Sequence, residues 1–580
     1  MNRRELLATT AAFLATTPAL AAANGAGKLR TPGADIAWVS YQAEAMKTSG
    51  TVLGPTYGPF LIENEAINQS CVKLGAPGDY VEFTVNAPAN TLVVRYCLPD
   101  ATQGGGLDDV LTLSRNGEVV REIALTSRFT WLYGEYPFTN NPADGKPRHF
   151  YDDARVKGIT LAKGDVVRLT KSGNGAPWCV IDLVDLEMAP PAAQKPEGVL
   201  SLADFGANGK GESDDTEALR ALLAAAAKGG KIAFVPAGDY KLTGDIELPS
   251  DVTLKGAGMW HTNFVGDEAL YDQAARRLRF KLTGVNSHLA DFALIGKVKY
   301  RNDNEQNDGI FGAGAQGCSV SRLWVEHTKV GMWFYVCSHI TIEGCRLRNT
   351  FADGINLCVD VRDSTIDNCS ARNTGDDCFA IWPAASDQGF TQHASAPGSN
   401  VIRRCTGQAP FLAQGASLYG GAGNRIEDCL FTDIGSGCGI LISTTFPTAD
   451  KTTDNNFSGI TTVRNCLLQR CGGYDHGWTW RAALQICLQR KNISGLRISD
   501  ITIEDSLSDG LSIITAEGLV DLRRLSDTVL ERITVKNYGV AAKGRHGLWV
   551  SANVTGSAKL SASTIGGVEN DSANFQILTD

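Results

Sequence analysis

The apolar positions of the chain repeat at a fixed offset between about residues 340 and 470. An aliphatic residue lies three positions before a cysteine in five successive segments, and these cysteines are 24, 36, 24 and 37 residues apart. The five pairs are Ile342 and Cys345, Ile366 and Cys369, Ile402 and Cys405, Ile426 and Cys429, and Val463 and Cys466. Two intervals are equal and two are longer, which indicates coils of about two dozen residues with loops inserted in some of them. We expect Ile503 and Ser506 to continue the series.

Residues 34–188 show a different pattern. Short runs of alternating apolar and polar residues are separated by Gly, Asn and Pro turns, as in YVEFTVNAPANTLVVRYCL. A period of two predicts strands with one buried face, and a series of short strands predicts a β-sandwich of the jelly-roll type. Residues 189–198 form a Pro- and Ala-rich linker. We therefore expect an all-β protein, in which this sandwich precedes the repeat region at 199–580.

One amphipathic helix is expected at the start of the second region. Its apolar face comprises Leu219, Leu222, Leu223 and Ala226. Asp214 and Glu217 have the spacing of a capping box, and the glycines at 229–230 predict the end of the helix. Strands are expected to follow.

The first 23 residues have the layout of an export leader. Arg3 and Arg4 precede a short, weakly apolar segment that ends in small residues suited to a signal peptidase. This layout resembles a twin-arginine signal, so we expect a secreted or periplasmic protein. No other stretch is long and apolar enough to span a membrane, and no membrane partner is expected.

Composition narrows the class of protein. The net charge of −9 is spread without long runs, which argues against a nucleic-acid partner. Fifteen cysteines are an odd number, so at least one thiol stays unpaired within the chain. Because the repeating cysteines are expected to stack in the interior, we predict mostly free thiols. The protein is expected to be a monomer.

Candidate chemistry lies in the stretch FADGINLCVDVRDSTIDNCSARNTGDDCFAIW, residues 351–382. Asp353 follows Cys345 by eight residues and Asp377 follows Cys369 by eight, so the two aspartates should occupy one position on consecutive coils. Strands in adjacent coils are about 4.8 Å apart, and two carboxylates held in that register repel each other. At least one should therefore have a raised pKa, as acid/base chemistry requires.

Asp376 adds a third carboxyl beside this pair. In a regular strand Asp376 and Asp377 would point to opposite faces, so we expect a bend at Gly375 that turns both outward. Three carboxyls suit hydrolysis of a glycosidic bond, and inversion needs an acid and a base about 6.5 to 9.5 Å apart. The stacked pair is too close for that. Asp376 is therefore assigned as the acid, and Asp353 and Asp377 hold and activate the water.

Four further residues are assigned to substrate binding. Sugar rings present apolar C–H faces that stack on aromatic side chains, so Trp382 and Tyr419 are candidates. Asn356, within ADGINL, and Gln414, within FLAQGASLYGG, complete the set.

Five segments carry a resemblance to a known family. They are ADGINL (Ala352–Leu357), NTGDDCFAIW (Asn373–Trp382), FLAQGASLYGGAGNRIEDC (Phe411–Cys429), GILIST (Gly439–Thr444) and EHTKVGMWF (Glu326–Phe334). They are similar to the α-1,3-glucanases and mycodextranases of glycoside hydrolase family 87. The resemblance implies a right-handed parallel β-helix and an inverting endo-hydrolase of α-1,3-glucosidic linkages in an α-glucan. It also implies catalysis by Asp353, Asp376 and Asp377 without a cofactor.

This chain departs from the family pattern at three positions. They are Gln414 and Ala416 in AQGASLYGG, and Cys378 after the two aspartates. These departures bear on the linkage preference more than on the chemistry.

The N-terminal region resembles carbohydrate-binding modules of families 35 and 6, from YQAE at Tyr41 to WCVIDLVDLEM at Met188. By that resemblance Glu44 and Asp182 would hold a structural calcium ion, because a hard cation prefers carboxylate oxygens.

Two alternatives remain open. A polygalacturonase-like or other exopolysaccharide-degrading β-helix enzyme shares NTGDDC, but its GHG and RIK segments, which meet substrate carboxylates, do not occur here. A polysaccharide-binding β-helix without catalysis explains the coils and gives no reason to stack Asp353 on Asp377.

Overall fold

The computed structural model describes residues 30–230, 232–392, 397–446, 457–475, 477, 479–516 and 519–580. Residues 32–580 belong to one compact unit. The leader expected at residues 1–23 lies outside the described residues. Within the described chain, no helix is both long and apolar enough to cross a membrane.

The first region is a sandwich of two antiparallel sheets. One sheet contains β1 (Trp38–Gln42), β3 (Thr51–Leu53), β4 (Cys71–Leu74), β6 (Ala89–Cys97), β11 (Asp152–Leu161) and β13 (Cys179–Glu187). The other contains β2 (Lys47–Thr48), β5 (Tyr80–Thr84), β7 (Asp108–Arg115), β8 (Glu118–Thr126) and β12 (Val166–Lys171). A short pair, β9 (Leu132–Tyr133) and β10 (Pro147–Arg148), and the 3₁₀ turns Ala43–Ala45, Ile62–Glu65, Ile67–Gln69 and Pro142–Asp144 complete it. Alternate residues of both sheets meet in one core that includes Val72, Leu113 and Leu169.

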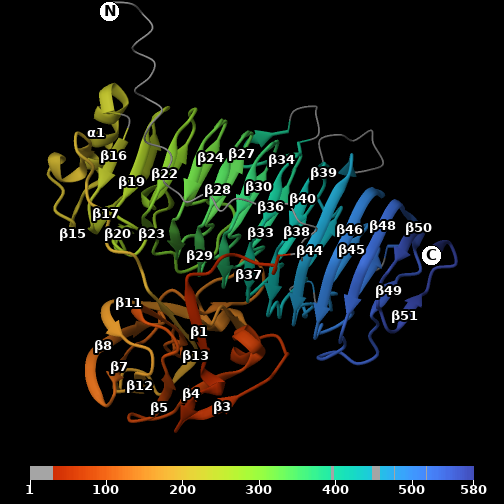
Figure 1. Ribbon diagram of the computed structural model, residues 1–580, viewed down its shortest axis with the longest axis horizontal. Coiled ribbons are helices and arrows are strands. Elements are labelled where there is room, and N and C mark those ends of the chain that lie inside the picture. The colour runs from red at the N-terminus through yellow and green to blue at the C-terminus, as the bar shows by residue number, and fades with distance from the viewer. Residues whose placement is uncertain are drawn as a thin grey trace, which may run out of the picture. The chain divides into compact units, whose positions relative to one another are not determined.

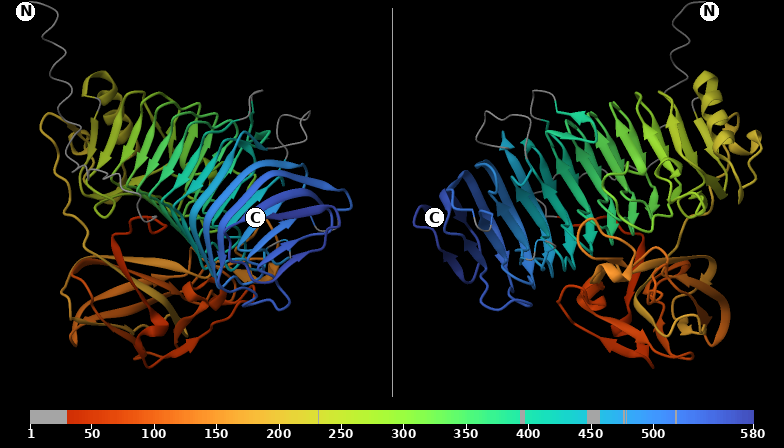
Figure 2. Two further views of the ribbon diagram at one scale, coloured as in Figure 1. Left: turned by 45° about the vertical axis from the view of Figure 1, so that its right-hand side comes forward. Right: turned by 180° about the vertical axis from the view of Figure 1, so that it is seen from behind.

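The second region is a parallel β-helix, so the predicted fold class is confirmed (Figure 1). One face is a single sheet of β18 (Asp245–Leu248), β21 (Arg279–Leu282), β24 (Gly309–Ala313), β27 (Met332–Tyr335), β30 (Ile355–Cys358), β33 (Phe379–Trp382), β38 (Ala416–Leu418), β42 (Ile440–Ser443), β45 (Leu484–Cys487), β47 (Leu511–Ile514), β49 (Leu548–Val550) and β51 (Val568–Asn570). We call it the front sheet. The coils stack in sequence order along it, as the colours in Figure 2 show.

A longer folded sheet supplies the other walls of each coil. It contains β14 (Leu200–Ser201), β15 (Lys210–Asp214), β16 (Ile232–Val235), β17 (Gly238–Leu242), β19 (Thr253–Gly256), β20 (Thr262–Gly266), β22 (His288–Ala290), β23 (Ala293–Ile295), β25 (Ser319–Ser321), β26 (Trp324–Glu326), β28 (Thr341–Glu343), β29 (Arg346–Arg348), β31 (Thr365–Asp367), β32 (Ser370–Arg372), β36 (Val401–Arg403), β37 (Thr406–Gln408), β40 (Arg425–Glu427), β41 (Leu430–Thr432), β44 (Thr461–Gln469), β46 (Ile493–Glu504), β48 (Arg523–Val535), β50 (Val554–Ser561) and β52 (Phe575–Thr579). Two small pairs lie in inserted loops: β34 (Ser386–Asp387) with β35 (Phe390–Thr391), and β39 (Gly421–Ala422) with β43 (Phe457–Ser458).

The register of this longer sheet confirms the repeat seen in the sequence. Ile342, Ile366, Ile402, Ile426 and Val463 are consecutive partners across β28, β31, β36, β40 and β44. The next partners are Ile498 and Ile501, opposite Val463 and Cys466. The expected continuation at Ile503 and Ser506 is therefore wrong. The partner of Val463 lies 35 residues later in the chain (498 − 463), whereas Ile503 lies 40 residues later (503 − 463). All fifteen cysteines are buried free thiols, as predicted.

Helix α1 (Thr216–Ala225) packs on the first coil, and a wider turn, Ala226–Gly230, ends it. Its predicted face of leucines and Ala226 is buried in the core. The expected capping box is wrong: Asp215 is the N-cap residue, Asp214 accepts a hydrogen bond from the Thr216 backbone N–H, and Glu217 pairs with Arg220. Asp214 and Asp215 thus form a local turn ahead of the helix.

The sandwich and the coils are linked by a segment between β13, which ends at Glu187, and β14, which begins at Leu200. Charged residues of β29 and β32 also contact the sandwich directly. Arg372 donates to Asp185 at 2.9 Å and lies 3.4 Å from Asp153, while both guanidinium nitrogens of Arg346 reach Glu187 at 2.7 and 2.9 Å. These groups are buried, so their mutual pairing offsets the cost of removing them from water. The sandwich and the coils are therefore joined by charge pairs as well as by apolar packing.

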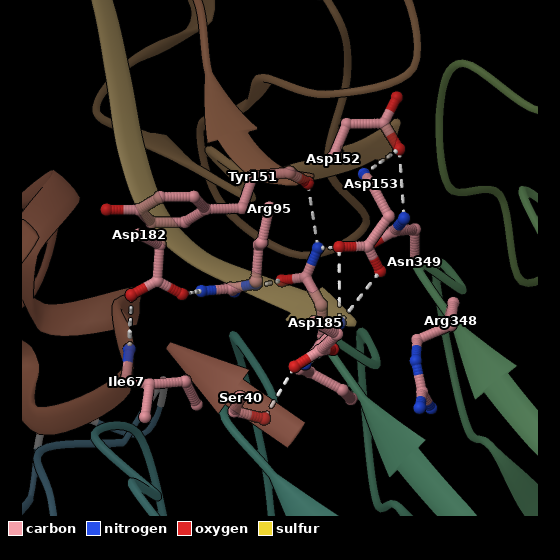
Figure 3. A network of polar contacts seen from close by, with 12 residues as sticks. Ser40, Ile67, Arg95, Tyr151, Asp152, Asp153, Asp182, Asp185, Arg348 and Asn349 are labelled. Atoms are coloured by element: carbon pink, nitrogen blue, oxygen red, sulfur yellow. Dashed lines mark hydrogen bonds and ion pairs between the residues drawn. The ribbon is translucent and has the colours of Figure 1, made fainter. Parts of the chain in front are cut away.

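The environment of Asp182 does not fit the calcium ion expected at Glu44 and Asp182. Asp182 is fully buried, pairs with the Arg95 guanidinium, and accepts the Ile67 backbone N–H at 3.0 Å (Figure 3). Glu44 accepts a hydrogen bond from the Asn68 side chain at 2.9 Å. Arg95 already supplies the positive charge that a cation would bring, and a second cation there would be repelled. The carboxyl of Asp182 thus has a different partner from the one the resemblance implied.

Candidate active site

The candidate site is a pocket of about 230 Å³ on the front sheet, where β27, β30, β33 and β38 lie side by side (Figure 1). Its lining includes Asp353, Asn356, Asp376, Asp377, Trp382 and Tyr419. The structure thus brings together the three predicted catalytic residues and three of the four predicted substrate-binding residues.

Backbone hydrogen bonds place Asp353 and Asp377 on neighbouring coils in the same register. Ile355 of β30 is the partner of Phe379 of β33, and the Gly354 N–H donates to the Asp377 carbonyl at 2.9 Å. Both aspartates precede their strands by two residues. They therefore stack about 4.8 Å apart along the coil axis, as expected from the 24-residue interval.

A bend at Gly375 allows Asp376 and Asp377 to face the pocket together. A Cβ at Gly375 would lie 2.1 Å from the Phe351 carbonyl oxygen, so any larger residue would displace the neighbouring coil. The Thr374 hydroxyl donates to the Asp376 carbonyl at 2.8 Å and closes the turn. The predicted bend is present, and it resolves the problem of two adjacent carboxyls in a strand.

Asp377 is held by three hydrogen-bond donors. They are the Gln414 backbone N–H at 3.1 Å, the Tyr419 hydroxyl at 3.0 Å and the Ser417 hydroxyl. Burial and then the Asp376 charge raise the pKa of Asp377 to about 7, although these donors stabilise its charged form. The side chain is therefore fixed in orientation and titrates near neutrality.

Asp353 has fewer stabilising partners. It is 5% exposed and accepts one hydrogen bond from the Asn356 amide at 2.5 Å. Burial, followed by the charges of Asp376 and Asp377, raises the pKa of Asp353 well above its usual range. The stacked pair thus holds a proton on Asp353 more firmly than on Asp377, as two close carboxyls sharing one charge do.

Asp376 differs from the pair in exposure. Its side chain is 28% exposed, and the Arg301 guanidinium lies 2.7 Å from its carboxylate. Arg301 also donates to the Gly375 carbonyl at 2.8 Å and pairs with Asp303 at 3.0 Å. Burial and the Asp376 charge raise the pKa of Asp303 to about 6. Asp376 therefore projects into the open pocket from a turn that Arg301 holds on two sides.

Aromatic side chains form the wall beyond the carboxyls. Trp382 packs against Phe446 at 4.8 Å and edge-on to Trp333 at 6.0 Å, and Tyr419 packs edge-on to Phe446. The indole N–H of Trp382 is buried and finds no hydrogen-bond partner among the described residues. A sugar hydroxyl can accept from it, so Trp382 offers both a stacking face and a donor.

Gln414 does not line the pocket. Its side-chain oxygen accepts the Cys438 backbone N–H at 2.5 Å, and its own backbone N–H holds Asp377. The assignment of its side chain to substrate binding therefore needs correcting: the backbone of Gln414 supports the Asp377 carboxyl, and its side chain braces the next coil.

The sandwich packs behind the turns that carry the three aspartates. The His149 ring stacks on Phe411 at 4.4 Å and meets the edge of Phe351 at 4.8 Å. Burial lowers the pKa of His149 to about 3, so the ring is neutral and acts as a packing surface. Asn373, just ahead of the bend, donates to the Tyr151 carbonyl at 2.8 Å. The sandwich thus fixes the backbone on which the aspartates stand.

Sequence reasoning missed several residues that line the pocket, and those closest to the argument are Tyr136, Arg301, Asp303 and Lys329. Tyr136 comes from the sandwich, and its ring lies 4.8 Å from the Arg301 guanidinium. Lys329 is buried and donates to the carbonyls of Asn302 and Glu305. None belongs to the coil repeat. The only signal was EHTKVGMWF, which contains Lys329.

The described residues contain no group of three or more His, Cys, Asp or Glu arranged to hold a metal ion. Arg301 and Lys329 lie among the carboxyls and add positive charge there.

Comparisons with known proteins follow the same division of the chain. The model of α-1,3-glucanase catalytic domain D1 matches residues 35–189, and that of catalytic domain D2 matches residues 212–565. The N-terminal region is thus described as part of a catalytic unit. Its resemblance to carbohydrate-binding modules of families 35 and 6 is not confirmed.

Solved structures are similar over nearly the whole chain. The catalytic unit of the thermostable family 87 α-1,3-glucanase from Streptomyces thermodiastaticus strain HF3-3 is 28% identical, with a TM-score of 0.78 and 94% of each chain covered. The catalytic domain of a family 87 α-1,3-glucanase in complex with nigerose is 24% identical, with a TM-score of 0.81 over 94% of this chain and 98% of that one. At that identity it shows the fold. Related complexes are of variants with one aspartate replaced by alanine, at positions separated by 23 residues and by one residue.

Curated relatives match only in part. The pre-neck appendage protein of Bacillus phage B103 is 26% identical over 187 residues, which cover 31% of this chain and 20% of that protein. The chain spans a fifth or less of the curated relatives it matches. The catalytic-domain models, by contrast, together cover both β-regions. The chain belongs to the α-1,3-glucanases of glycoside hydrolase family 87.

Proposed function

We propose that the protein hydrolyses α-1,3-glucosidic bonds within a neutral α-glucan, with inversion at the anomeric carbon. One observation carries this proposal: two buried carboxyls are stacked in register while a third projects separately into the same pocket. Inverting hydrolysis needs that division, because a water molecule must fit between the base and the sugar.

The three aspartates are given separate roles. Asp377 takes a proton from the water, because its three donors favour its charged form over that of Asp353. Asp353, which keeps its proton, holds the water beside Asp377. The water oxygen then attacks the anomeric carbon, the glycosidic C–O bond breaks, and the leaving oxygen takes a proton from Asp376. Protons return to Asp376 and leave Asp377 through solvent between turnovers.

Arg301 controls the position of Asp376, the proposed acid. Its guanidinium orients Asp376 in the free enzyme, and this ion pair must loosen for Asp376 to carry a proton. Entry of the glucan removes water from the pocket, and we infer that it also moves Arg301 away from Asp376.

Separations between aspartates support the assignment. The positions replaced by alanine in the family 87 complexes are 23 residues and one residue apart. Asp353, Asp376 and Asp377 have the same two separations. Nigerose and tetrasaccharides are bound in those complexes, which supports an α-1,3-linked glucan as substrate here.

The proposal also includes the setting of the reaction. We propose that it takes place outside the cytoplasm, after export directed by the twin-arginine-type leader. We further propose that the protein is a monomer, that it cuts bonds in the interior of the glucan chain, and that it needs no cofactor for catalysis.

The test is reducing-end release from α-1,3-glucan, nigeran, dextran and polygalacturonate. We expect release from the α-1,3-linked polymers only, and anomeric NMR should detect the β-anomer first. Release from polygalacturonate alone would move the assignment to a pectinase-like enzyme, and release from none would favour a binding protein.

A fluoride substrate separates the acid from the water-holding pair. Fluoride leaves without a proton, so Asp376→Ala should still cleave α-nigerosyl fluoride, whereas Asp353→Ala and Asp377→Ala should not. Loss of fluoride cleavage in Asp376→Ala alone would contradict the assigned roles.

A further inference from the structure

A second, larger hollow lies on the front sheet beyond the active site. It measures about 690 Å³ and is lined by residues of β45, β47 and β49 and of the segments beside them. We call it the distal groove and define it by Gln485, Ser512 and Trp549, which project outward from these three strands. Neither the catalytic aspartates nor their partners belong to it.

The distal groove continues the outward side-chain row of the active site. Strand partners in this row, in order, are Trp333, Asn356, Ala380, Ser417, Leu441, Gln485, Ser512 and Trp549. Gln485 lies three strands beyond Ala380, which is about 14 Å at 4.8 Å for each strand. A polymer that runs along the coil axis from the aspartates therefore reaches the distal groove within a few sugar units.

Gln485 has an unused hydrogen-bond donor at the base of the groove. The residue is 1% exposed, and its side-chain oxygen accepts from the Ala482 N–H and the Ser512 hydroxyl, each at 3.3 Å. Its amide nitrogen finds no partner among the described residues. Since buried polar groups are nearly always paired, this amide is suited to an acceptor oxygen that enters from the groove.

Aromatic side chains border the groove. The Trp549 indole N–H donates to Asp571 at 2.9 Å, which fixes the orientation of the ring. Trp480 also lines the groove and packs edge-on to Tyr474 at 5.4 Å. Oriented indole faces beside amide donors match the C–H faces and hydroxyls of a sugar ring.

Charges around the groove are balanced. Arg481 pairs with Asp475, and Arg545 lies 3.5 Å from Asp509. Each arginine that lines the groove therefore has a carboxylate beside it. This favours a neutral ligand over a polyanion, which would need unpaired cations.

From these contacts we propose that the distal groove binds a remote segment of the same neutral α-glucan chain that is cut at Asp353, Asp376 and Asp377. This inference rests on the proposed function and extends it to a second binding site. A long chain then gains affinity from two linked sites, whereas a short oligosaccharide that fills only the active site gains nothing.

The experiment compares polymer and oligosaccharide kinetics for two groove variants. Trp549→Ala removes the stacking face, and Gln485→Glu keeps the acceptor for Ala482 and Ser512 while removing the amide donor. We expect each to raise KM for polymeric α-1,3-glucan about tenfold, the equivalent of one lost contact, with kcat and short-oligosaccharide kinetics unchanged. Trp549→Phe should recover part of the loss. Trp178→Ala, an aromatic truncation in the sandwich, is the matched control.

A binding measurement keeps the two proposals distinguishable. Depletion of the protein by insoluble α-1,3-glucan is measured in the inactive Asp376→Asn background, with and without Trp549→Ala. Weaker depletion caused by Trp549→Ala supports the distal groove even if the wild type cleaves no polymer in the panel. Equal depletion and equal KM for wild type and both groove variants would overturn it, while normal cleavage by the wild type would leave the proposed function intact.

Discussion

Two like-charged ladders lie on the same pair of coils, and they differ in what surrounds them. Arg348 is the strand partner of Arg372, and five residues later in each coil Asp353 stacks on Asp377. On the arginine side the sandwich places Asp153 and Asp185 beside Arg372. The aspartate pair receives hydrogen-bond donors, but no cation of the described residues forms an ion pair with Asp353 or Asp377, and Arg301 pairs with Asp376 instead.

The difference separates structure from chemistry. Paired charges on the arginine side connect two β-regions, and each partner offsets the desolvation of the other. Unpaired carboxyls on the aspartate side have raised pKa values. A stacked like-charge pair is thus a functional signal only when the tertiary structure leaves it without counterions.

The largest effect should come from the aspartate ladder. Asp377→Asn removes the carboxylate that takes the proton from the water, and kcat should fall about 10²- to 10⁴-fold. Stability should not fall, because the variant also removes a carboxyl that is buried beside two others. Steady-state kinetics and thermal unfolding of the same preparation check both halves, and a large loss of Tm would show that the pair is structural.

On the arginine side a substitution should lower the stability of the protein. Arg372→Met leaves Asp153 and Asp185 buried without a cation, which should cost about 3 to 5 kcal/mol in the free energy of unfolding. Denaturant unfolding measures it. Arg497→Met, at a partly exposed arginine that pairs with Asp527, is the control and should change stability by less than about 1 kcal/mol. Equal losses in the two variants would contradict the comparison.

Hydrogen bonds to Asp377 should set the pH at which activity falls on the acidic side of the pH–activity profile, its acidic limb. They stabilise the charged carboxylate and so lower its pKa, which burial raises to about 7. Ser417→Ala removes one donor, so the pKa rises and the limb moves to higher pH, by about one unit for a charged hydrogen bond. Tyr419→Phe should shift it in the same direction. A limb that moves to lower pH would exclude Asp377 as the base.

The smallest effect is expected at the other rung of the arginine ladder. Arg348 donates to the carbonyls of Leu347 and Ser370, and burial lowers its pKa to about 9. Because no described carboxylate pairs with it directly, Arg348→Met should cost about 1 kcal/mol or less. Denaturant unfolding beside Arg372→Met tests this, and a comparable loss would mean that Arg348 shares the same counterions.

The sequence predicted the strand register of most coils correctly, but it predicted the roles of individual site residues less completely. The spacing of isoleucines and cysteines predicted the register, and that register correctly stacked Asp353 on Asp377. The same spacing failed at Ile503, because loop lengths vary from coil to coil and the partner of Val463 is Ile498. Gln414 was placed in the right turn but with the wrong role, since a spacing does not say which atom of a residue faces a pocket.

What the sequence by itself determined is therefore the coil and the consequences of its period. Neighbouring coils in a parallel β-helix pair residue by residue, so a local repeat fixes which side chains stack. The tertiary structure alone decided what meets those stacks from elsewhere. Arg301 reaches Asp376 across 75 residues, and Tyr136 reaches Arg301 across 165. Such contacts depend on loop conformation and on the packing of a second β-region, and neither leaves a periodic trace in the chain.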